Sequence, residues 1–282
     1  MIRTQFALPI ALVGALLAAP LHAADTAPAG LPNPFYAIYT AFDRPGLTLD
    51  QQFDLVKQLG FAGIAWTETA PEQAKATAEQ LAKRGLKMHA IYCAASVTPE
   101  GDLKHSPNLP ELMQVLKGHG TIVWLHIGGR GPAFEKLTGQ EPAIAKLRAL
   151  SDTAAANDLR IAIYPHVGEW TARFGDATKL ARVVNHPKFG VTFNLCHCLA
   201  LGDEQQIPAL LDAAKPVLVT VTICGADSGV KDWSRLIQTL DKGTFDNGVV
   251  LRKLKAIAFT GPIGFQGFGI AGDARSILAP TM

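Results

Sequence analysis

Two histidines and an asparagine end neighbouring apolar runs of the sequence, where a polar side chain is least expected. His166 ends the run 160–167, and Asn194 and His197 end the run 189–198. Imidazole can take or give a proton near neutral pH, and an amide can bind hydroxyl and carbonyl groups. A lone histidine in a strand is more often a hydrogen-bonded structural residue. Two of them at adjacent strand ends, beside an amide, instead favour a functional site.

Most other apolar runs also end in polar or aromatic side chains when they are read at period two. These side chains are Thr40, Trp66, Glu68, Trp124, His126, Tyr164, Thr222, Cys224 and Gln266. Glu68, Glu169 and Asp227 are equal candidates for a general base or for a solvated loop charge. Structural and functional roles are equally supported for His126, whereas His89, in the middle of a run, is expected to be structural. The shared polarity predicts a polar pocket at one end of the fold.

Eight apolar runs rich in β-branched and aromatic residues must position these side chains, and amphipathic stretches separate them. The runs span residues 35–42, 60–68, 86–93, 121–128, 160–167, 189–198, 217–224 and 261–267. The expected helices span residues 47–59, 71–84, 110–117, 141–157, 176–184, 203–214, 233–240 and 245–256. This is the pattern of an α/β protein with a single (β/α)8 TIM barrel, in which catalytic groups gather at the carboxyl ends of the strands. A doubly wound open sheet is the alternative.

The first residues have the three parts of a secretory signal peptide. Arg3 precedes an apolar run at residues 7–19, and small residues follow at 18–24. The run is shorter than the roughly 20 residues that cross a bilayer. We therefore expect a signal peptide at 1–23, a linker at 24–34 and the barrel at 35–282. The mature protein is expected to be periplasmic or secreted from a bacterium, with no membrane attachment after cleavage.

Composition excludes several classes of protein. The 282 residues are 48% hydrophobic and 18% charged, which predicts a packed core rather than disorder. The formal net charge is +2, and no basic run stands out, so nucleic acid is not an expected partner. Four cysteines cannot be the main scaffold of a chain of this length. Cys93 and Cys224 could approach each other across the pocket, although buried free thiols are favoured.

A glycine-rich segment near the end of the chain imitates a dinucleotide-binding motif. Residues 267–272 read G-x-G-x-x-G between an expected strand and an expected helix. A dinucleotide site also needs a following strand and an acidic residue about 20 positions further on, and the sequence to Met282 offers neither. No nucleotide cofactor is expected. The backbone amides of this loop could instead hold an anion or sugar hydroxyls.

Three motifs together resemble a known family. They are Tyr-Pro-His at 164–166, Gly-Val-Thr-Phe-Asn-Leu-Cys-His at 190–197 and Gly-Pro-Ile-Gly-Phe-Gln-Gly at 261–267. From about residue 35 to the end, the chain resembles the xylose isomerase-like TIM barrels. This is the sugar phosphate isomerase/epimerase group related to AP endonuclease family 2. Within that group it is similar to a secreted bacterial branch that also carries Gly-Asp-Ala-Arg, here 272–275.

The resemblance implies a divalent metal held by Glu, Asp, His and Glu on strands five to eight. This sequence has Tyr164, Asn194, Thr222 and Gln266 near those positions and keeps only His197. The loss of three carboxylates removes most of the negative charge that holds Mg²⁺ or Mn²⁺. One divalent ion on His166, His197, Asn194 and Gln266 is one alternative, and a metal-free pocket is the other.

The resemblance also implies a carbohydrate substrate. We expect an exported sugar isomerase or epimerase that removes a proton next to a carbonyl. The expected catalytic residues are His166, His197 and Glu68, and the expected substrate-binding residues are Tyr164, Asn194, Gln266, His126 and Trp66. A keto-sugar lyase or hydratase and a non-catalytic sugar-binding barrel are the alternatives, whereas abasic-site cleavage is opposed by export and the neutral charge. Phosphorylated substrates are disfavoured, because only Arg130 and Lys231 supply positive charge near the mouth. The oligomeric state is left open.

Overall fold

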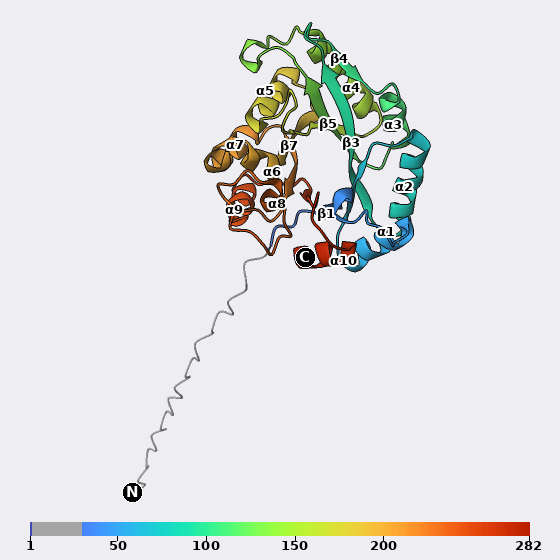
Figure 1. Cartoon of the computed structure of the whole chain (residues 1–282), viewed down its shortest axis with the longest axis vertical. Helices are drawn as coiled ribbons and strands as arrows, with labels where there is room; N and C mark the ends of the chain where they lie inside the picture. The colour runs from blue at the N-terminus through green and yellow to red at the C-terminus, as the bar shows by residue number, and fades with distance from the viewer. Residues whose placement is uncertain (2–29) are drawn as a thin grey trace. The chain divides into compact units, whose positions relative to one another are not determined.

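Eight parallel strands close into a ring in the computed structural model, which describes Met1 and residues 30–282 (Figure 1). They are β1 (Phe35–Ile38), β2 (Gly63–Thr67), β3 (Lys87–Val97), β5 (Ile122–Gly129), β6 (Arg160–Ile163), β7 (Phe189–Asn194), β8 (Leu218–Ile223) and β9 (Ile263–Phe265). Each strand pairs in parallel with the next along the chain, and β9 pairs with β1. The predicted TIM barrel is confirmed, and the open sheet is excluded. The predicted signal peptide and most of the predicted linker lie outside the described residues.

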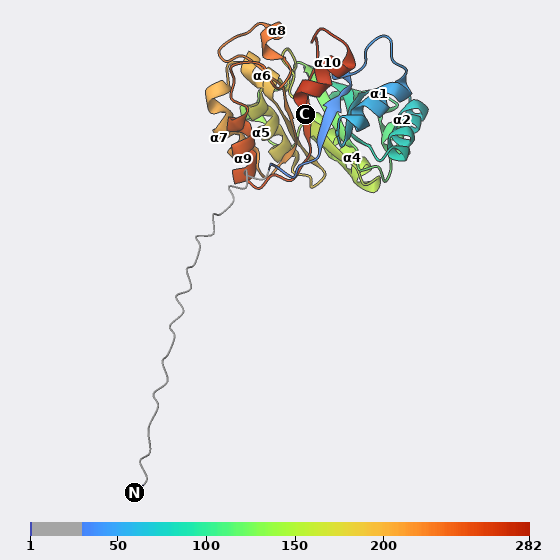
Figure 2. The same ribbon diagram turned by 90° about the horizontal axis from the view of Figure 1, so that it is seen from below.

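Helices follow the strands and cover the outside of the ring (Figures 1 and 2). They are α1 (Leu49–Gln58), α2 (Pro71–Lys83), α3 (Leu109–Val115), α4 (Pro142–Ala156), α5 (Phe174–Val184), α6 (Leu195–Ala200), α7 (Ile207–Ala214), α8 (Trp233–Leu236), α9 (Gly248–Ala256) and α10 (Ala274–Leu278). Figure 2 shows α8 and α10, which follow β8 and β9, toward the same end of the barrel. Among the described residues, no helix has the length and apolar character needed to cross a membrane.

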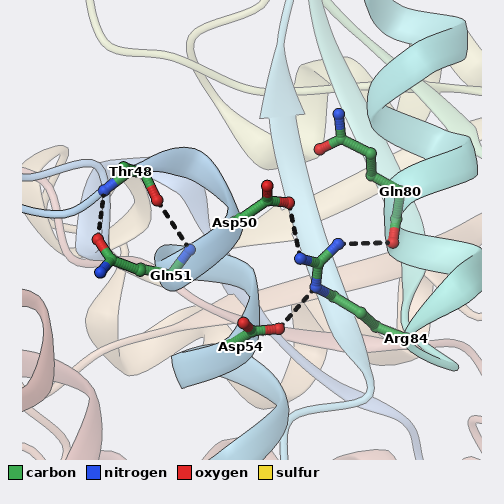
Figure 3. Close-up of polar contacts among 6 residues, drawn as sticks. All are labelled: Thr48, Asp50, Gln51, Asp54, Gln80 and Arg84. Carbon is green, nitrogen blue, oxygen red and sulfur yellow. Dashed lines mark hydrogen bonds and ion pairs between the residues drawn. The ribbon is translucent and has the colours of Figure 1, made fainter.

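Local sequence signals fix the first βα unit. The Thr48 hydroxyl accepts a hydrogen bond from the Gln51 backbone N–H, and the Gln51 side chain accepts one from the Thr48 N–H, so the two residues form a capping box at the start of α1. Arg84, at the end of α2, donates to Asp50 and Asp54 of α1 at 2.6 and 2.7 Å (Figure 3). Both carboxylates are largely exposed, so these ion pairs orient α2 on α1 more than they stabilise the fold.

The interior of the ring is packed with side chains and is not a pore. Tyr36, Trp124 and Tyr164 are its largest members, and small residues from neighbouring strands make room for them. The Tyr36 hydroxyl pairs with the Thr220 hydroxyl at 3.0 Å. His89 is buried and stacks on Tyr36, with ring centroids 5.1 Å apart. Burial and the nearby Lys87 lower the pKa of His89 to about 4, so it is a neutral core residue.

The structure corrects three local predictions. β3 continues to Val97 and pairs with an antiparallel strand, β4 (Leu103–His105), which the sequence pattern did not indicate. The apolar run 189–198 is a strand only to Asn194, after which α6 begins, so His197 lies on a helix. Trp66 was predicted to point into the barrel, but Ala65 does so, because β2 pairs in regular register with β1 and Ala65 lies opposite Ile38, which faces the interior. All four cysteines are buried and free, in agreement with the thiols expected at Cys93 and Cys224.

Candidate functional site

A cavity of about 490 Å³ opens among the residues that follow the barrel strands. Half of its lining residues are Tyr, Trp or Phe: Tyr39, Trp66, Tyr92, Trp124, Tyr164, Trp233 and Phe268. Its polar side chains are Thr40, His166, His197 and Gln266. In the described part of the chain, no Asp, Glu, Lys or Arg lines this cavity. Such a cavity suits an uncharged ligand that has both hydroxyl groups and an apolar face.

His166 and His197 lie side by side in this cavity, with ring centroids 4.2 Å apart. Their tautomers differ, because both rings bond to the backbone of Val167. His166 Nδ1 lies 3.0 Å from the Val167 carbonyl oxygen, which can only accept, so Nδ1 carries a proton and the neutral ring has its lone pair on Nε2. His197 Nδ1 accepts from the Val167 N–H at 3.1 Å, so its proton is on Nε2. The site therefore presents one nitrogen base and one N–H donor.

His197 keeps this neutral form over a wide pH range. Its side chain is on the first turn of α6, and the residue is only 6% exposed. Burial, and secondarily the neighbouring His166, lower the pKa of His197 to about 3. Charging the ring would also require Nδ1 to give up its bond from the Val167 N–H. His197 can thus polarise a carbonyl oxygen as a neutral donor without becoming a cation.

Gln266 holds the other polar wall of the cavity in place. Its Oε1 accepts from the Thr40 hydroxyl at 2.8 Å and from the Phe268 N–H at 3.0 Å. Its Nε2 donates to the Tyr164 hydroxyl at 3.2 Å. Burial raises the pKa of Tyr164 well above its ordinary value, so the phenol keeps its proton. The Tyr164 hydroxyl can therefore donate to a ligand while it accepts from Gln266.

Asn194 lies beneath the cavity and not on its surface. It is 2% exposed, and its Oδ1 accepts from the Thr222 hydroxyl at 3.1 Å and from the Cys196 thiol at 3.3 Å. Its Nδ2 donates to the Pro165 carbonyl at 3.4 Å. Asn194 therefore supports the turn that carries His166. It has no free polar atom aimed at a ligand.

The remaining predicted site residues are divided. Trp66 lines the cavity, although it packs outward on Phe53 of α1 at 5.9 Å. His126 and Glu68 are not part of the lining. His126 stacks on Tyr92 at 4.6 Å, with its Nδ1 3.4 Å from Glu169. Burial lowers its pKa, and Glu169 opposes the change.

Glu68 accepts from the Ala94 N–H at 3.2 Å, a backbone contact away from the cavity. The structure thus brings together His166, His197, Tyr164, Gln266 and Trp66, with Asn194 directly below them.

Sequence reasoning missed several residues of the site. Tyr92 lies two residues after Ala90, near the end of the run 86–93, so it is on the same face of the strand. The rule that selected Tyr164 would also have selected it. Trp233, the first residue of α8, and Phe268, in the loop after β9, lie beyond the strand ends, which the period-two reading of the apolar runs does not reach. Val167 acts only through its backbone, so its residue type gives no indication of its role.

Comparison with known proteins identifies the family. The family model described as "xylose isomerase-like TIM barrel" matches residues 53–278. The chain belongs to this family. No curated protein matches. The match covers most of the barrel and agrees with the resemblance seen in the motifs of β6, β7 and β9.

Several solved structures share the fold of this chain at low sequence identity. A probable 3-DHS dehydratase from Bacillus anthracis has a TM-score of 0.65 at 12% identity, over 88% of this chain and 96% of that one. A 3-keto-D-glucoside 4-epimerase from E. coli has a TM-score of 0.64 at 13% identity, over 88% and 96%. The IOLI protein with a bound zinc atom has a TM-score of 0.68 at 16% identity, over 88% and 95%. Such low identities establish the fold alone.

The residues of this xylose isomerase-like barrel do not fit a divalent ion in their present arrangement. Both lone pairs of Asn194 Oδ1 and of Gln266 Oε1 already accept hydrogen bonds from protein groups. The tautomer of His197 places a proton on the nitrogen that would have to bind the metal. Of the four ligands considered from sequence, only His166 offers a free lone pair. Within the described residues, no three His, Cys, Asp or Glu side chains gather in a metal-binding group.

Proposed function

We propose that this protein is an enzyme that removes a proton next to the carbonyl of an uncharged sugar, with His166 as the base. The observation that carries the proposal is the pair of opposite tautomers in one cavity. Fold relatives are described as a 3-keto-D-glucoside 4-epimerase and a probable 3-DHS dehydratase, which supports this reaction class. The uncharged lining supports a substrate without phosphate or carboxylate.

The first step needs only groups that the site contains. His166 Nε2 takes the proton from the carbon beside the carbonyl, and the C–H bonding electrons form the carbon–carbon double bond of an enediol. The carbonyl oxygen gains negative charge, which the Nε2–H of His197 and the hydroxyl of Tyr164 stabilise by hydrogen bonds. Return of the proton from His166 to the neighbouring carbon gives an isomerised sugar, with the oxygen-bound proton redistributed through the enediol. Alternatively, the protonated His166 gives its proton to a β-hydroxyl, the C–O bond breaks as water leaves, and the enediolate electrons re-form the carbonyl and make a new carbon–carbon double bond, which gives a dehydrated sugar.

Deuterium exchange tests this proposal directly. The protein is incubated in D₂O with uncharged ketosugars, a methyl 3-ketoglucoside and D-fructose among them, and the carbon-bound hydrogens are followed by NMR. We expect exchange beside the carbonyl that persists after treatment with EDTA. His166→Gln should abolish the exchange, and His197→Gln should slow it by about 10²-fold or more, as for the loss of an oxyanion donor.

A matched control uses a histidine far from the cavity. His119→Gln removes an imidazole from the loop after α3 and should leave the exchange rate unchanged. The proposal is overturned when no ketosugar of the panel exchanges. It is also overturned when exchange requires an added divalent metal or survives in His166→Gln.

We further propose that the protein acts outside the bacterial cytoplasm. The proposal rests on the pattern of Arg3, the apolar run and the small residues that follow it. N-terminal sequencing of the protein from the periplasm or culture medium should begin at Ala24. Recovery of the intact N-terminus in the cytoplasmic fraction would refute export.

A further inference from the structure

Two exposed aromatic side chains lie at the same cavity. Five large apolar residues are exposed among those that the structure describes: Met1, Leu47, Trp233, Phe268 and Met282. The two aromatic ones, Trp233 at 43% and Phe268 at 64% exposure, both line the cavity that contains the histidines. Single exposed apolar residues are ordinary, but two large aromatic ones at the edge of one cavity indicate a binding surface.

Both aromatic residues are held by residues of the inner site. Trp233 begins α8, where Asp232 caps the helix by accepting from the Ser234 N–H at 3.0 Å. Its ring meets His197 edge to face, with centroids 5.2 Å apart. Phe268 donates its backbone N–H to Gln266 Oε1. The outer aromatic surface is therefore positioned relative to the inner polar site before any ligand binds.

The cavity is larger than the volume that one sugar ring occupies. A volume of about 490 Å³ falls within the range of pockets that enclose a drug-sized ligand. A hexose has only about half the heavy atoms of such a ligand, so one ring at the histidines leaves the outer part of the cavity unfilled.

The charge of the cavity limits what fills that space. Since no charged side chain lines the described cavity, a phosphate or carboxylate there would be desolvated without a partner. Flat aromatic faces instead favour a second uncharged ring.

We propose that Trp233 and Phe268 form an outer subsite for the second ring of an uncharged glycoside, so that the enzyme acts on a glycoside and not on a free sugar or a sugar phosphate. The inference deepens the proposed function, because the inner ring of the glycoside is the sugar that faces His166. Trp233 and Phe268 stack on the second ring, which is a sugar or an aryl group. The glycosidic oxygen joins two uncharged rings, as the uncharged lining requires.

Equilibrium binding tests the subsite without any need for turnover. Isothermal titration would compare four forms of each of several common hexoses: the free sugar, its methyl glycoside, its 4-nitrophenyl glycoside and its 6-phosphate. Homodisaccharides of the same sugars complete the panel. For the sugars that bind, we expect the 4-nitrophenyl glycoside or the disaccharide to bind about tenfold tighter than the methyl glycoside. The 6-phosphate should bind more weakly than either.

Three variants show where the gain arises. Trp233→Ala and Phe268→Ala should lose the tenfold gain in affinity and keep the affinity for the methyl glycoside. Because both side chains are exposed, we expect both variants to fold, and a thermal melting curve of each variant checks this. Leu47→Ala, an exposed apolar residue that does not line this cavity, is the matched control and should bind every ligand as the wild type does.

The outer subsite is refuted when the second ring adds no affinity, when the phosphate binds tightest, when both Ala variants keep the gain, or when no glycoside of the panel binds. Failure of deuterium exchange with intact two-ring binding would overturn the proposed reaction alone.

Discussion

The two buried neutral histidines predict that the fold loses stability on mild acidification. Burial lowers the pKa of His89 to about 4 and that of His197 to about 3, against an ordinary value of 6.5. In the unfolded chain both rings take up a proton as the pH falls through 6.5, whereas in the folded protein they stay neutral. Protonation then favours the unfolded chain, so the free energy of unfolding must fall below that pH.

The size of the loss follows from these values. At pH about 5 each unfolded histidine lies about 1.5 pH units below its ordinary pKa, and each unit is worth about 1.4 kcal/mol. Each residue therefore lowers the free energy of unfolding by about 2 kcal/mol, and the pair by about 4 kcal/mol. Since domains are stable by only about 5 to 15 kcal/mol, a loss of this size is easily measured.

Urea unfolding measures the free energy of unfolding at pH about 7.5 and at pH about 5, and the predicted loss is the difference between the two values. His89→Phe keeps a ring against Tyr36 and removes a buried nitrogen that has no partner among the described residues, so it should halve the difference. The double variant with His197→Gln should remove most of it, and His119→Gln should retain the wild-type difference. An undiminished difference in the double variant would falsify the assignment to these two rings.

Three further predictions concern single features. Thr48→Ala removes the capping box of α1 and should cost about 1 kcal/mol in urea unfolding, with the binding of sugars unchanged. Gln266→Leu leaves its hydrogen-bonding partners unpaired and should cost about 1 to 3 kcal/mol, together with a weaker affinity for every bound sugar in titration. Because His166 and His197 lie on one wall, the proton should leave and return on one face of the sugar. NMR of the products should show isomerisation or dehydration, and inversion at the exchanging carbon would contradict this.

The sequence predicted the barrel because strands buried on both faces read as nearly continuous apolar runs. All eight runs overlap a strand of the ring. The alternation with helices left an open sheet as the alternative, which the pairing of β9 with β1 excludes. The sequence did not predict β4, whose three residues pair only through contact with the extended β3. Trp66 was assigned to the wrong face because a period-two pattern shows the alternation of side chains but not which set faces inward. The small Ala65 faces the interior, where Tyr36 and Trp124 fill the space, and Trp66 packs on Phe53 of α1.

The sequence predicted most polar members of the candidate site but not their chemistry. Strand-end position was enough to select His166, His197, Tyr164 and Gln266, which line one cavity. The tautomers depend on the backbone of Val167, and backbone position is a property of the folded turn. The same limit explains why Glu68 was chosen. A carboxylate at a strand end has the right type for a base, but its hydrogen bond to the Ala94 N–H directs it elsewhere.

The two amides show how a neutral site can replace a charged one. Asn194 and Gln266 stand where the family resemblance places carboxylates, and each Oδ1 or Oε1 accepts two hydrogen bonds, as a carboxylate oxygen could. Each side-chain NH₂ also donates, Asn194 to the Pro165 carbonyl and Gln266 to the Tyr164 hydroxyl, which an ionised carboxylate cannot do.

These donor bonds hold the turn that carries His166 and orient the phenol beside it. The exchange of acid for amide thus supplies the donors that position an imidazole base. A site built this way needs neither a buried anion nor a cation to balance it. The uncharged glycoside that we propose as the substrate would bring no charge into this site.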